Sequence, residues 1–209
     1  MEEFLAESAY AVVALAGVLF GAMIACFINH LITARENRSR IGEKLFDKKL
    51  EAYENLIDIT NVIRSMVFLG GEDQKKELKR CPLIMQSRRN MDDFLSELMR
   101  LQTKADSWLS ATVKREVTLF LDYFVNLYEQ SHASSDEALK EAGVLIRTDF
   151  IDFAARLEGC AHDFFNKDLM KLKFRGDRGR HKYPRERTLD ELGKTELFKQ
   201  KQKVMDILR

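Results

Sequence analysis

The chain has 209 residues, a net charge of +1 and 32% charged side chains, so its overall charge gives no argument for a nucleic-acid partner. Its three cysteines, Cys26, Cys81 and Cys160, are odd in number and lack paired spacing. That pattern argues against a disulfide framework and a zinc site, and it suits a reducing cytoplasm. We expect neither a metal nor a cofactor.

The N-terminal region is the most informative part of the sequence. Residues 8–34 carry no formally charged side chain, and within them the 20 residues from Ala9 to Ile28 form a nearly continuous apolar run. A helix of that length is about 30 Å long, which matches the hydrocarbon core of a bilayer. The run therefore predicts a transmembrane helix within residues 1–32.

The flanks of this run predict its orientation. Only acidic side chains, Glu2, Glu3 and Glu7, precede it, whereas Arg35 and several further Lys and Arg residues follow it. The positive-inside rule then places the N-terminus outside and the remainder of the chain in the cytoplasm. The alternative, a cleaved signal peptide, would have a basic start and a shorter apolar stretch.

Helical periodicity dominates the rest of the sequence, which contains only two prolines. Spacings of three and four predict a long helix over about 34–69, within a juxtamembrane region of residues 33–71, ended by the glycines at 70 and 71. Further helices are predicted over 86–105, 109–131, from a cap at 134–135 to about 174, and from a cap at Thr188 to about 208. The fold class we expect is all-α: one N-terminal transmembrane helix followed by a cytoplasmic helical bundle, residues 72–209.

Small residues recur at spacing four within the predicted span, at Gly17, Gly21 and Ala25. Such a stripe lets two helices approach closely in lipid, where packing drives their association. It therefore indicates self-association, although glycine is also common in membrane helices. Asn29 and His30 follow near the cytoplasmic end, where they would rim a pore or simply meet the lipid headgroups.

Two basic segments have alternative interpretations. The run from Arg35 to Lys49 accounts for the topology and could also bind anionic lipid. The loop over 175–187 could contact RNA or phosphate, or could simply be solvated. Its basic residues are Arg175, Arg178, Arg180, Lys182, Arg185 and Arg187.

An arginine and a histidine, Arg156 and His162, are separated by five residues in the helix predicted around them. This spacing fits the R-x(4–6)-H signature of HEPN domains, small helical bundles that often act as metal-independent ribonucleases. A histidine can move the proton of an RNA 2′-hydroxyl, and an arginine can stabilise the charge on phosphorus. Two features count against a nuclease. Positions six apart on a straight helix lie about 120° and 9 Å apart, and Leu157 stands where active members usually carry a polar residue.

The combination of a single N-terminal membrane helix, an all-α domain of this size and a late R-x5-H motif resembles the small membrane accessory protein of type VI-B CRISPR systems. The resemblance implies a HEPN-like cytoplasmic bundle and a homo-oligomeric ring in the bacterial inner membrane. It also implies permeabilisation of the membrane during phage defence, in support of an RNA-guided, RNA-targeting effector. Arg156 and His162 would be the HEPN pair.

The expected function is therefore a homo-oligomeric inner-membrane pore in antiviral defence, with membrane lipid and other copies of the chain as partners and without enzymatic activity. One alternative is a membrane-anchored ribonuclease that uses Arg156 and His162. Another is a membrane-tethered scaffold whose bundle docks a second protein.

Overall fold

The computed structural model describes residues 2–70, 79–169 and 185–208, and the side chains at 2–16, 18, 19, 106, 167–169 and 185–187 are not described. The described chain is mostly helical, which confirms the expected all-α class. It divides into two compact units, residues 1–47 and 48–209. The boundaries predicted at 32 and 71 stay predictions.

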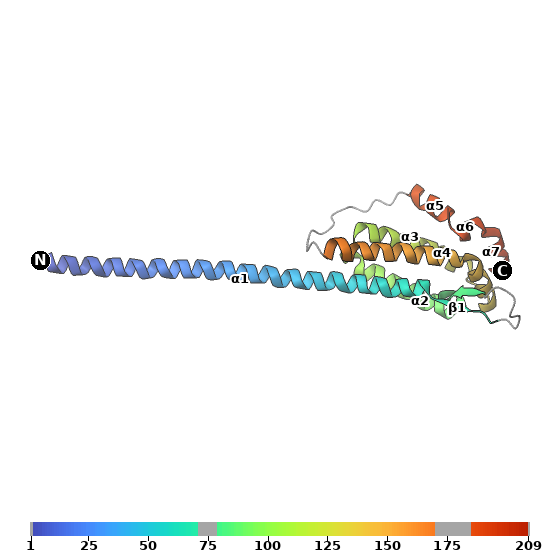
Figure 1. Ribbon diagram of the computed structural model, residues 1–209, viewed down its shortest axis with the longest axis horizontal. Coiled ribbons are helices and arrows are strands. Elements are labelled where there is room, and N and C mark those ends of the chain that lie inside the picture. Colours follow the sequence, from blue (N-terminus) through green and yellow to red (C-terminus); the bar gives the residue numbers. More distant parts are fainter. Residues whose placement is uncertain (1, 71–78, 170–184, 209) are drawn as a thin grey trace. The chain divides into compact units, whose positions relative to one another are not determined.

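The first helix, α1, runs without interruption over Glu2–Arg64 and supplies the whole first unit (Figure 1). From residue 20 to residue 32 its large apolar side chains are between 49% and 64% exposed. Among the described residues, no helix is both long and apolar enough to cross a membrane. Much of the predicted span, at residues 9–16, 18 and 19, lies outside the residues whose side chains are described.

The second unit is a helical bundle built around the end of α1, with α2 over Arg88–Ala105, α3 over Ala111–Gln130 and α4 over Asp136–Asp163 (Figure 1). Serine side chains begin two of these helices: Ser110 accepts a hydrogen bond from the Val113 amide, and Ser135 accepts one from the Ala138 amide. Each satisfies a backbone donor that lacks a partner within its helix. The cap predicted at 134–135 is thereby confirmed at Ser135.

Aromatic side chains from α2, α3 and α4 fill the centre of this bundle. Phe94 of α2 makes edge contacts with Phe120 and Phe124 of α3, and Phe120 in turn contacts Phe150 of α4. The C-terminal part of α1 joins the same core through Tyr53, whose ring stacks on Phe164 at 3.7 Å between centroids. Burial of these large rings supplies much of the hydrophobic stabilisation of the unit.

The long helix predicted to reach residue 69 ends instead at Arg64, so the prediction that glycines 70 and 71 terminate it was wrong. Met66–Phe68 forms a strand, β1, that pairs antiparallel with β2, Arg80–Pro82. A short 3₁₀ helix, η1, follows over Leu83–Gln86. The backbone groups of β1 bond to residues twelve or more positions away in the sequence. Helical periodicity contains no information about such distant pairings.

At the C-terminal end of α4 the chain continues as a π-helix, η3, over Phe164–Leu169, and the predicted extension toward residue 174 lies beyond the described residues. The single last helix predicted from Thr188 is divided into three: α5, Arg185–Gly193; α6, Glu196–Lys199; and α7, Lys201–Leu208. Thr188 lies within α5 and is buried, so the prediction that it caps the helix was wrong.

Close packing between α4 and β2 depends on a glycine in the N-terminal third of α4. A Cβ placed at Gly143 would lie 2.7 Å from Cys81 Sγ and 3.2 Å from Pro82 Cδ. A larger residue at this position would therefore force Cys81 and its neighbours to shift. The same burial raises the pKa of the Cys81 thiol to about 11.

Candidate functional site

Arg156, the arginine of the R-x5-H motif, lies at the centre of a charged network that joins three helices. Its Nη2 is 2.6 Å from Glu116 Oε2 on α3, and its Nη1 is 3.2 Å from Glu191 Oε2 on α5. The Glu116 side chain is only 8% exposed and also pairs with Arg115 at 3.0 Å. Both nitrogens at the end of the guanidinium are thereby engaged, and the arginine holds α5 against α3 and α4.

The electrostatics of Glu191 reflect this arrangement. Burial raises the pKa of this carboxyl, but a hydrogen bond from Lys194 and the positive charges of Arg156 and Lys194 outweigh that effect. The net result is a pKa below the ordinary value, so Glu191 is ionised near neutral pH and available to the guanidinium.

His162 is exposed and lies one turn after Glu158, which pairs with Arg64 at the end of α1. The hydrogen bond from Arg64 lowers the pKa of Glu158, and the charges of Arg64 and His162 add to this effect and outweigh the opposing effect of desolvation. The helix is continuous through Gly159. Helical geometry therefore places His162 roughly 120° and 9 Å away from Arg156, so the two side chains do not form a joint site within one chain.

Leu157, the residue that departs from the pattern of active HEPN members, is buried in the core at 1% exposure. A polar residue there would need a partner inside the bundle. Leu157 thus contributes to packing, and Arg156 beside it contributes to holding helices together. Both observations agree with a structural role for this part of α4.

A buried carboxylate, Asp149, was not singled out by sequence reasoning. Its two oxygens accept hydrogen bonds from the amides of Glu196, at 2.7 Å, and Leu197, at 2.9 Å, and from the Tyr123 hydroxyl at 2.9 Å. Burial raises the pKa of Asp149, although these three donors oppose the shift. The residue caps α6 and fixes the C-terminal helices on α4.

The predicted membrane-packing residues lie in the first unit. Gly17, Ala25, Asn29 and His30 are exposed on α1. No heavy atom of the described chain lies within 4 Å of a Cβ built at Gly17 or Gly21, so this face is open in a single copy. The basic loop residues at 175–184 lie outside the described residues, and those at 185–187 open α5 without described side chains.

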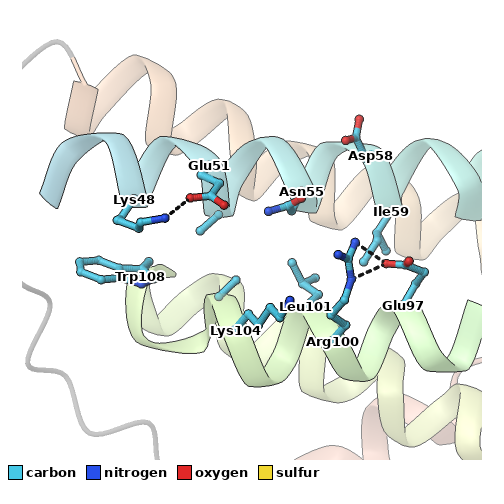
Figure 2. Close-up of a pocket in the computed structure, with 12 residues that line it drawn as sticks. Lys48, Glu51, Asn55, Asp58, Ile59, Glu97, Arg100, Leu101, Lys104 and Trp108 are labelled. Atoms are coloured by element: carbon cyan, nitrogen blue, oxygen red, sulfur yellow. Dashed lines mark hydrogen bonds and ion pairs between the residues drawn. The ribbon is translucent and has the colours of Figure 1, made fainter. Parts of the chain in front are cut away.

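A groove of about 310 Å³ runs between α1 and α2 in the second unit (Figure 2). Figure 2 shows Trp108 and Lys48 toward one end of the groove and Asp58 and Glu97 toward the other. Two ion pairs line it, Lys48–Glu51 at 2.6 Å and Arg100–Glu97 at 2.7 Å. Because its positive and negative side chains balance, the groove selects no class of ligand by charge, and we assign no reaction to it.

Among the described residues no group of His, Cys, Asp and Glu side chains is arranged to hold a metal ion. In comparisons with known proteins, no family model, no curated protein and no solved structure matches the chain.

Proposed function

We propose that the protein is a single-pass, homo-oligomeric membrane protein that permeabilises the bacterial inner membrane in support of an RNA-guided antiviral effector. Its N-terminus would face outward, and the HEPN-like helical domain would lie in the cytoplasm. The CRISPR context and the HEPN assignment come from the resemblance described for the sequence, not from a matched relative.

The observation that carries the proposal is the apolar surface of α1 between residues 20 and 32. Phe20, Met23 and Phe27 are each more than 60% exposed on one face of the helix, and Ile32, on the side opposite Met23, is 51% exposed. In water this surface would be costly, at about 25 cal/mol for each square ångström of apolar area. A helix that is apolar all round normally lies in lipid or against other helices.

The surroundings of Arg156 favour the pore over the ribonuclease alternative. The guanidinium already pairs with two carboxylates, and His162 lies on another side of α4. In this proposal Arg156 stabilises the bundle through its ion pairs, and His162 has no catalytic role. The scaffold alternative shares the membrane anchor but requires no association between the copies.

Dye release from liposomes that contain the purified chain tests the proposal. The variant Gly17→Leu/Gly21→Leu fills the small-residue stripe, and Ala22→Leu/Cys26→Leu adds the same side chains on another face of α1. We expect release by the native chain and the control, and loss of release in the glycine variant. If no release occurs even with the activated effector present, the pore proposal is wrong and the scaffold is favoured.

A further inference from the structure

A regular apolar seam extends along α1 beyond the predicted span. It consists of Phe27, Leu31, Ala34, Arg38, Ile41 and Leu45, which alternate at spacings of four and three. Outside the apolar run, between residues 33 and 45, the only apolar side chains are Ala34, Ile41 and Leu45, and all three belong to the seam. Alternating spacings of four and three are the heptad pattern by which one helix packs along another.

Lipid does not account for the outer part of the seam. Ile41 lies thirteen residues after Ile28, or roughly 20 Å along the helix axis, whereas the headgroup layer adds only about 5–8 Å on each side of the hydrocarbon core. Ile41 is 58% exposed and Leu45 is 44% exposed within one chain. These side chains therefore face water unless another protein surface covers them.

We propose that the seam joins copies of this chain, whose α1 helices pack parallel and in register through Ile41, Leu45 and the preceding seam residues. The parallel direction rests on the proposed function, because copies inserted in one membrane share one orientation. The heptad period identifies the partner as a helix that follows α1 over several turns, and a second α1 carries the same period at the same height.

Charged residues in and beside the seam shape this contact. Arg38 occupies a core position, where a single polar residue sets register at some cost in stability. In a parallel, in-register pair Arg38 faces its own counterpart, and Lys44 lies beside the seam, so the contact brings like charges together. Because salt screens such repulsion, association should strengthen as ionic strength rises.

Cysteine cross-linking of the full-length protein in membranes tests the seam. All variants are made in a background with Cys26, Cys81 and Cys160 replaced by alanine. Ile41→Cys and Leu45→Cys lie on the seam, and Ser39→Cys and Glu43→Cys lie about 160° around the helix from Ile41. We expect disulfide-linked dimers on mild oxidation at the two seam positions and none at the two control positions, with a higher yield at high salt. Equal yields at all four positions, or none at the seam positions, would overturn the proposal.

A second pair of variants tests the contact without cross-linking. Ile41→Asp places a charge in the seam, and Ser39→Asp makes the same change on the opposite face. We expect Ile41→Asp to shift the detergent-solubilised oligomer toward the monomer in light scattering, with unchanged Trp108 emission, and Ser39→Asp to leave the oligomer intact. If Ile41→Asp keeps the native mass, copies do not associate through the seam.

The two proposals can fail separately. Seam cross-links without dye release would refute the pore and support the seam. Dye release without seam cross-links would support the pore and refute the seam.

Discussion

Replacing Arg156 by alanine should destabilise the helical domain rather than remove a catalytic group. The change leaves Glu116 with Arg115 as its remaining cation and Glu191 with Lys194. Removing one partner of a fully buried ion pair costs about 3–5 kcal/mol. The Arg156 side chain is 38% exposed and Glu116 keeps one partner, so a loss of about 1–3 kcal/mol in the free energy of unfolding is expected.

Urea unfolding followed by the emission of Trp108, the only tryptophan in the chain, measures this loss. His162→Ala is the matched control from the same motif and should unfold like the native protein, because its side chain is exposed. Adding Glu116→Gln to Arg156→Ala should recover part of the loss, since it removes the carboxylate left with too little positive charge.

The reasoning would be refuted if Arg156→Ala unfolded at the native urea midpoint, or if both motif variants lost equal stability. A stable Arg156→Ala protein that lost an RNA-cleaving activity present in the native chain would instead identify a ribonuclease. Because the expected instability also abolishes activity, any activity measurement on Arg156→Ala requires the folded fraction to be known first.

Three further changes test the packing and electrostatics of the same domain. Asp149→Asn should lose about 1–2 kcal/mol in urea unfolding because an amide cannot accept all three hydrogen bonds, whereas Asp152→Asn, at an exposed position, should lose little. Gly143→Ala should destabilise through its contacts, whereas Gly159→Ala, with open space around it, should stabilise by up to about 1 kcal/mol, as compared by thermal unfolding. The pKa of Glu191 is lowered from 4.5, so its contribution to stability is present above pH 4.5 and is lost as the pH falls through the folded-state pKa. Glu191→Gln should therefore make the free energy of unfolding less dependent on pH below pH 4.5, as measured by urea unfolding at a series of acidic pH values.

Several properties of the chain followed from local patterns in the sequence. Apolar residues at spacings of three and four predicted α2, α3 and α4, because one buried face on a helix requires that period. Ser135 was identifiable as a cap because its side chain satisfies an amide only three residues away. The apolar run after an acidic start, and the heptad continuing beyond it, are likewise contained in short windows of sequence.

Only the tertiary structure decided which residues act together across helices. Glu116, Arg156 and Glu191 lie 40 and 35 positions apart in the sequence, and their pairing depends on how α3, α4 and α5 pack. The end of α1 at Arg64 depends on the pairing of β1 with β2, and the break before α6 depends on the buried Asp149. Local periodicity determines which face of a helix is buried. The segment that covers that face is determined by contacts between residues far apart in the sequence, because those contacts satisfy the charges and backbone groups that each helix leaves unpaired.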